Sequence, residues 1–227
     1  RLQQEGIAAN VIWSVDPKGE SSPVNLTKGR NASLRYRYIQ LDREEEFINP
    51  TKPLLLYVFS EKTKSSGYAH LDLATGHLQT LIMQEAQFDN RPIKAKDADV
   101  IAFTRETFEE FPDLRLTTDR FESNARISNA NPQQADYNWG TAELFSWKSF
   151  DGKELEGVII KPENFDSTRK YPVLVNFYER SSDRLYRHRT PSPGRSTINY
   201  AFYASRGYVI FNPDVYPMNF TWLTGKV

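Results

Sequence analysis

The sequence predicts a mixed fold, with an all-β first part followed by an α/β second part. In the first part, short apolar segments recur about every ten residues with turn sequences between them, which is typical of antiparallel sheets in a sandwich or a propeller. In the second part, the apolar segments 171–178 and 208–212 flank a helical pattern, which is typical of a βαβ unit. The 12 Tyr, 14 Phe and 4 Trp residues also favour strands over helices.

The first part is expected to be a series of short strands. Residues 34–38 alternate apolar and charged side chains, which is the period of a strand with one solvated face. Turn sequences at 64–67 and 74–76 predict an antiparallel meander around them. No strict repeat is visible, so a propeller is the expectation and a sandwich the alternative. The expected strands are 10–16, 34–38, 54–60, 67–73, 77–83, 99–105 and 114–118.

A domain boundary is expected near Trp139-Gly140. The preceding segment 124–138 is polar and rich in Asn, Gln and Ala, which predicts an irregular connection. The expected domains are therefore a propeller-like all-β domain over 1–140 and an α/β domain over 141–227.

The second part is expected to begin with a hairpin and a buried strand. Asp151-Gly152 lies between the strand patterns 143–150 and 154–160, a strong signal for a tight antiparallel turn. The next strand is 171–178, with Pro172 at its start because proline has no amide hydrogen for the ladder.

A helix and a last strand follow. The helix is expected over 197–206, with Ser196 as its N-cap and Gly207 as its left-handed C-terminal residue. The strand 208–212 then completes a right-handed βαβ unit. An incomplete sheet would leave an unpaired edge at Tyr208–Asn212, which favours either pairing with another chain, and thus a homo-oligomer, or poor order after Asp214.

Composition excludes several functions. Lys and Arg together number 29, as do Asp and Glu, so no net charge attracts nucleic acid or a membrane surface. The absence of cysteine excludes disulfides, thiolate metal sites and a cysteine nucleophile. No apolar segment is long enough to span a membrane. His70 and His77 lack the spacing of metal ligands, so neither a metal nor a cofactor is expected.

Two charged groups are weaker candidates for binding or catalysis. A basic loop could bind an anion, although a solvated loop partly paired with Glu179 and Asp183 is the favoured interpretation. The neighbouring carboxylates Glu44-Glu45-Glu46 and Glu109-Glu110 are of the type used by glycosidases, but such pairs are far more common on surface loops. The basic loop comprises Arg180, Arg184, Arg187, His188, Arg189 and Arg195.

Residues in the second part resemble a known family. The series Asp151-Gly, Lys161-Pro-Glu-Asn-Phe, Lys170-Tyr-Pro-Val-Leu-Val, Tyr178, Ser205-Arg-Gly-Tyr-Val and Pro213-Asp214 is similar to the prolyl oligopeptidase family of serine peptidases, and most similar to its bacterial, dipeptidyl-peptidase IV-like branch. The resemblance is specific over 142–214 and looser upstream. It implies the last blades of a β-propeller followed by the start of an α/β-hydrolase domain, and hence a fragment of a larger protein.

The resemblance assigns chemistry to Tyr178 alone, and Asp214, which follows a buried strand, is expected to be a turn or helix-cap residue. Tyr178 matches the tyrosine whose hydroxyl stabilises the oxyanion of the tetrahedral intermediate in that family. A neutral phenol suits this task because it donates one hydrogen bond without carrying charge. The alternative is a strand-end tyrosine with its ring in the core and its hydroxyl in water. The sequence departs from the family at Glu179-Arg180, where relatives have small residues, and after Asp214, where relatives have a glycine-rich loop.

The resemblance also implies a function that this chain cannot perform alone. No G-x-S-x-G motif is present, so the serine, acid and histidine of a triad are expected beyond Val227 and the chain itself is expected to be inactive. The parent would be a peptidase that cleaves short peptides, with cleavage after proline as one expectation, through an acyl-enzyme. It would be periplasmic or secreted rather than cytoplasmic. The alternative is a non-catalytic binding or scaffold protein with propeller-like and hydrolase-like surfaces.

Overall fold

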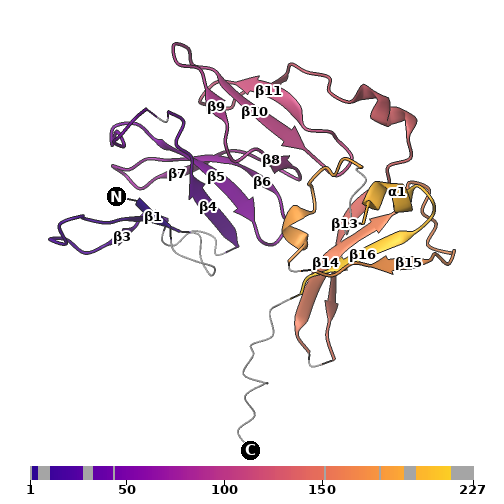
Figure 1. Ribbon diagram of the computed structural model, residues 1–227. Helices are drawn as coiled ribbons and strands as arrows, with labels where there is room; N and C mark the ends of the chain where they lie inside the picture. The colour runs from indigo at the N-terminus through magenta and orange to yellow at the C-terminus, as the bar shows by residue number, and fades with distance from the viewer. Residues whose placement is uncertain are drawn as a thin grey trace, which may run out of the picture. The chain divides into compact units, whose positions relative to one another are not determined.

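The computed structural model describes residues 2–4, 11–27, 33–42, 44–150, 152–178, 180–191 and 198–215. They are mostly β-sheet with little helix (Figure 1). The chain divides into two compact units, Arg1–Asn131 and Pro132–Val227. The predicted boundary at Trp139-Gly140 lies inside the second unit, immediately before its first strand.

Among the described residues, the first unit has three antiparallel sheets, with nearly every strand beside its neighbour in sequence. This order makes each sheet a meander with short connections. The first sheet comprises β1 (Leu2–Gln4), β2 (Ile12–Ser14) and β3 (Val24–Asn25); the second β4 (Leu34–Tyr38), β5 (Leu54–Ser60), β6 (Ser66–Leu71) and β7 (Leu78–Gln84); and the third β8 (Gln87–Phe88), β9 (Ile93–Lys94), β10 (Ile101–Glu106), β11 (Asp113–Thr117) and β12 (Ala125–Arg126).

The expected strands of the first unit are confirmed to within two residues at each end. Strands β1, β3, β8, β9 and β12 were not predicted. They are two or three residues long, which is too short for an alternating pattern to be visible in the sequence.

The second sheet is buried on both faces. Leu54, Leu56 and Val58 of β5 belong to one apolar cluster together with Ile12 of β2. Leu55, on the opposite face of β5, belongs to a second cluster with aromatic residues of β8 and β10. Burial on both faces explains why β5 is apolar at nearly every position rather than at alternate ones. Adjacent blades of a propeller stack in this way.

Tyr68 of β6 lies at the centre of the second cluster. Its ring is fully buried and meets Phe88 and Phe103 edge to face, with ring centroids 5.6 Å and 5.7 Å away, respectively. Its hydroxyl donates a hydrogen bond of 2.6 Å to the carbonyl of Asp89. Burial raises the pKa of this phenol, so it remains a protonated donor.

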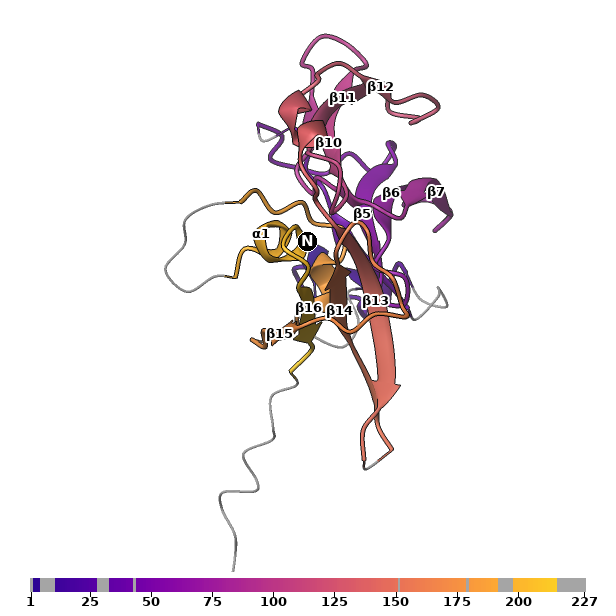
Figure 2. The ribbon, with the colours of Figure 1, turned by 90° about the vertical axis from the view of Figure 1, so that its right-hand side faces the viewer.

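The second unit contains one mixed sheet in the order β13-β14-β16-β15. The β13–β14 and β14–β16 pairs are antiparallel, whereas β15 and β16 are parallel, as predicted for the βαβ unit. Figure 2 shows α1 beside β16, and the two elements are in contact. Tyr200, Ala201 and Ala204 of α1 are buried, as is Ile210 of β16. The elements are η1 (Pro132–Asp136), β13 (Thr141–Lys148), β14 (Glu154–Lys161), β15 (Val173–Val175), η2 (Ser182–Arg184), α1 (Tyr200–Ala204) and β16 (Val209–Pro213).

The predicted hairpin is confirmed, and the predicted helix is too long. Strands β13 and β14 pair antiparallel from Thr141↔Lys161 to Lys148↔Glu154, and Asp151 lies outside the described residues. The α-helix begins after Asn199, whose side chain accepts a hydrogen bond from the Phe202 amide. Gly207 has the predicted left-handed conformation, with φ of +81°. The N-cap of α1 is Asn199 rather than the predicted Ser196, which lies outside the described residues.

The predicted unpaired edge at Tyr208–Asn212 is wrong. Strand β16 lies inside the sheet, with β14 on one side and β15 on the other. The sheet therefore ends at β13 and at β15, where Val173 and Val175 are 56% and 53% exposed. The fully buried Ile210 of β16 accordingly pairs with Ile160 of β14 on one side and with Leu174 of β15 on the other. The homo-oligomer expected from that edge is not tested by this strand order and remains a prediction.

Gly157 permits the close approach of β16 to β14. A Cβ atom at this position would lie 2.5 Å from the carbonyl oxygen of Asn212 and 2.8 Å from the Cα atom of Pro213. No side chain fits into that space, so only glycine allows the C-terminal end of β16 to pair here.

Membrane-spanning helices are not found in the described part of the chain, where no helix is long and apolar enough to cross a bilayer.

Replacement of Tyr68 tests the packing of the first unit. We expect Tyr68→Ala to lower the free energy of unfolding by about 3–5 kcal/mol through loss of a buried ring. Tyr68→Phe keeps the ring but leaves the Asp89 carbonyl without its donor, at a cost of about 1 kcal/mol. The measurement is urea-dependent hydrogen exchange of the β5 and β6 amides. Phe47→Ala is the control, because Phe47 is 83% exposed and its removal is expected to change stability by less than about 0.5 kcal/mol.

Candidate functional site around Tyr178

The end of β15 is anchored to β16 by Asn176. The Asn176 amide continues the parallel ladder by donating to the Phe211 carbonyl at 2.9 Å. Its side-chain nitrogen donates to Asn212 Oδ1 at 2.9 Å and to the Tyr200 hydroxyl at 3.1 Å. The Tyr200 hydroxyl in turn lies 3.2 Å from Asn212 Oδ1, to which it donates. These buried polar groups satisfy one another, so the strand end has a fixed position.

Tyr178 lies two residues beyond this anchor and is 76% exposed. Phe177 before it is also largely exposed. The alternative considered for Tyr178, with its ring in the core, is therefore wrong. A reactant in solvent can reach the phenol, which is the first requirement for a hydrogen-bond donor to a substrate. The oxyanion role itself remains a prediction.

The loop after Tyr178 is held by Asp214, which directly follows β16. Asp214 Oδ1 accepts hydrogen bonds from the amides of Ser181 at 2.6 Å and Ser182 at 2.8 Å. Its Oδ2 atom accepts from the Ser182 hydroxyl at 2.6 Å. These donors begin η2, so Asp214 caps that helical turn from outside it. This confirms the cap role predicted for Asp214, but its partners could not be read from the sequence.

Arg180 joins three carboxylates around the same turn. Its guanidinium lies 3.1 Å from Asp183, 3.6 Å from Glu156 and 3.7 Å from Asp214. The Glu156 carboxylate also lies 3.0 Å from the Ser182 hydroxyl. At the position where the sequence departs from the family, Arg180 thus forms ion pairs that hold this turn. Glu179 lies outside the described residues.

Two further residues of the basic loop, His188 and Arg189, also make contacts within the protein. The Arg189 guanidinium lies 4.5 Å from the centroid of the Tyr200 ring, and burial lowers its pKa. Buried His188 stacks on Trp139 at 4.9 Å, and its Nε2 atom lies 2.8 Å from Gln134 Oε1. Arg184 and Arg187 are exposed, and Arg195 lies outside the described residues. The paired-loop interpretation is therefore favoured over a preformed anion site.

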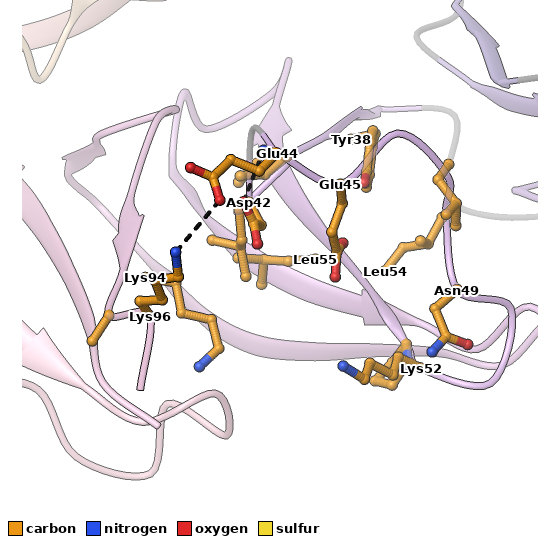
Figure 3. A pocket seen from close by; sticks show the side chains of 15 residues that line it. Tyr38, Asp42, Glu44, Glu45, Asn49, Lys52, Leu54, Leu55, Lys94 and Lys96 are labelled. Carbon is orange, nitrogen blue, oxygen red and sulfur yellow. Dashed lines mark hydrogen bonds and ion pairs between the residues drawn. The ribbon is translucent and has the colours of Figure 1, made fainter. Parts of the chain in front are cut away.

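The acidic candidates lie in the first unit, where two of them line a pocket of about 530 Å³ (Figure 3). Glu44 and Glu45 line it, but lysines line it too, and Glu44 forms an exposed ion pair of 3.5 Å with Lys96. Glu110 similarly pairs with Arg105. These contacts describe charge-balanced surface loops and do not place two carboxylates on either side of a substrate.

In the part of the chain that the structure describes, no three His, Asp or Glu side chains are arranged so that they could hold a metal ion. His70 is half-buried in the second sheet, and burial lowers its pKa.

Solved peptidase structures share this fold. Dipeptidyl peptidase 4 from Porphyromonas gingivalis is 19% identical, with a TM-score of 0.64 over 90% of this chain and 27% of that chain. A post-proline cleaving enzyme from Rickettsia typhi is 13% identical, with a TM-score of 0.57 over 94% of this chain and 30% of that chain. Acylaminoacyl peptidase from Pyrococcus horikoshii is 18% identical, with a TM-score of 0.54 over 90% of this chain and 28% of that chain.

The resemblance found in the sequence is thus confirmed at the level of the fold. The chain spans between 27% and 30% of the length of these three structures, as a fragment would. No protein-family model and no curated protein sequence matches it.

The burial of His188 predicts a pH dependence. Burial lowers its pKa below the ordinary value of 6.5. The unfolded chain therefore binds more protons than the folded chain as the pH falls through 6.5, and the second unit loses stability on acidification. We expect a His188 ring titration by NMR to give a pKa below 6.5.

Two variants check this cause. Trp139→Ala removes the ring that covers the imidazole and should return the His188 pKa towards 6.5. In urea unfolding, His188→Gln should lose this part of the acid sensitivity. An unchanged His188 pKa in the Trp139→Ala protein would contradict the assignment to burial.

Proposed function

We propose that this chain is part of a serine peptidase of the prolyl oligopeptidase type, in which Tyr178 donates a hydrogen bond to the oxyanion. The observation that carries the proposal is the position of Tyr178, an exposed phenol at the carboxyl end of a parallel strand that is anchored on both sides. In open α/β sheets, ligands bind outside the carboxyl ends of the strands. The shared fold with three solved peptidases supports this assignment.

The chemistry follows from the donor that Tyr178 supplies. When a serine oxygen attacks a peptide carbonyl, negative charge develops on the carbonyl oxygen. A phenol hydroxyl that points at this oxygen stabilises the charge without having to lose its own proton. In a hydrolase of this fold the second donor is the amide beside the nucleophile. The remaining chemistry requires a serine, an acid and a histidine from the parent protein.

The two units divide the work in this proposal. The stacked sheets of the first unit would be blades of a propeller that limits access by size, so the substrates would be short peptides. Proline before the cleaved bond is the preferred case, because one of the solved structures with this fold is named as a post-proline cleaving enzyme. No nucleic acid, metal or cofactor takes part.

A periplasmic or secreted location belongs to the same proposal. A chain with no cysteine has no thiol that could form a wrong disulfide in an oxidising compartment.

Covalent labelling tests the division between chain and parent. We expect a fluorophosphonate probe to label the full-length protein that carries this sequence, because the probe reacts with an activated serine. The 227-residue chain alone should remain unlabelled, since it has no G-x-S-x-G nucleophile. Labelling of the short chain, or no labelling of a folded full-length protein, would contradict the proposal. The second result would favour the non-catalytic scaffold.

Substitution of Tyr178 tests its assigned role. In the full-length protein, Tyr178→Phe should lower kcat about 100- to 1,000-fold with little change in KM, as for loss of other oxyanion donors. Tyr137→Phe is the matched control, because Tyr137 is similarly exposed at 67% and has no role in the mechanism. Equal kcat values for the two variants would remove Tyr178 from the site.

A further inference from the structure

Asp214 is a buried carboxylate with an unusually complete set of partners. Its side chain is fully enclosed, and it accepts hydrogen bonds from the amides of Ser181 and Ser182 and from the Ser182 hydroxyl. Arg180 lies 3.7 Å from its Oδ2 atom and supplies a compensating positive charge. Its own amide donates to the Glu156 carbonyl at 2.9 Å, which fixes the residue to β14.

A buried charge is expensive unless every lone pair and the charge itself are satisfied. Among the described residues, the hydrogen-bond donors to the Asp214 side chain are Ser181 and Ser182, in the loop that follows Tyr178, and the neighbouring cation is Arg180 of the same loop. The carboxylate therefore serves to hold this loop, and its removal would leave two amides and a hydroxyl without their acceptor.

In the sequence, Tyr178 lies between two residues whose contacts fix the backbone, Asn176 and Ser181. On its N-terminal side, Asn176 is bonded to Phe211 and Asn212 of β16. On its C-terminal side, Ser181 is bonded to Asp214, just beyond the same strand. The exposed Tyr178 thus lies in sequence between two residues, Asn176 and Ser181, that are bonded to points only a few residues apart at the end of β16.

We propose that Asp214 is a positioning residue for the candidate site. Through the amides of Ser181 and Ser182, it holds the segment that aims the Tyr178 hydroxyl at the oxyanion. This inference rests on the proposed function of Tyr178. Asp214 acts on the backbone after Tyr178 and touches neither substrate nor reacting atoms.

The first experiment uses the 227-residue chain and measures the contacts of Asp214 with Ser181 and Ser182, which we call the clamp. It requires no assay of enzymatic activity. The wild type and the Asp214→Ala, Asp214→Asn and Asp183→Asn variants are compared by hydrogen exchange and by the ¹⁹F signal of 3-fluorotyrosine placed at position 178. We expect Asp214→Ala to lose amide protection at residues 181–182 and to shift the ¹⁹F signal. Asp214→Asn should have a smaller effect, since its amide oxygen can still accept from the backbone.

Asp183→Asn is the matched control. Asp183 also contacts Arg180, at 3.1 Å, but the Ser181 and Ser182 amides bond to Asp214. Protection of the β13 and β14 amides shows in each variant that the sheet is still folded. If Asp214→Ala does not fold, Ser182→Ala removes one contact of the clamp and should give a weaker form of the same shift. An unchanged ¹⁹F signal in folded Asp214 variants overturns the proposal.

The second experiment measures the consequence in the full-length protein. Asp214→Asn should lower kcat by up to about 100-fold, the cost of a misplaced group, with KM nearly unchanged. Added to Tyr178→Phe, it should cause almost no further loss, because it acts through a hydroxyl that is already absent. Additive losses overturn the positioning role. If the Asp214 variants release the clamp but Tyr178→Phe leaves kcat unchanged, the function proposed for Tyr178 is overturned. Asp214 is then an anchor of the loop and has no positioning role.

Discussion

The close pairing of β16 with β14 at Gly157 is the constraint on which the candidate site depends. Because glycine leaves room for the backbone of Asn212 and Pro213, β16 can lie inside the sheet with β15 beside it. The end of β16 then presents Asn212 to one side of the Tyr178 segment and Asp214 to the other. A side chain at position 157 would displace both polar anchors together.

The two units solve the burial of sheet faces differently. In the first unit the second sheet is covered on both faces, and its strand β5 is apolar throughout. In the second unit, the side of the sheet with Ile160 and Ile210 is buried, whereas Phe145 is half exposed in an aromatic group with Trp147 and Phe211. The sequence predicts one buried strand over residues 171–178, but of these only Val173–Val175 form a strand, β15, which lies at the edge of the sheet with Val173 and Val175 exposed.

The candidate site combines residues that sequence reasoning valued unequally. Tyr178 was identified through a family resemblance, and Asp214 only as a turn or cap residue. The signal that could have raised the rank of Asp214 is its place, as an acid directly after a buried strand. Asn176 and Glu156 gave no such signal, because their partners lie 36 and 26 residues away in sequence.

The sequence by itself determined the longer strands, the hairpin, the parallel βαβ unit and the place of Tyr178 shortly after the third strand of the second unit. These features depend on local periodicity, turn residues and glycine conformation, which act over a few neighbouring residues. Only the tertiary structure decided the strand order, and with it the place of β16 between β14 and β15. Strand order depends on which surfaces pack best across long separations, so the partners that fix Tyr178 emerged only when the chain was folded.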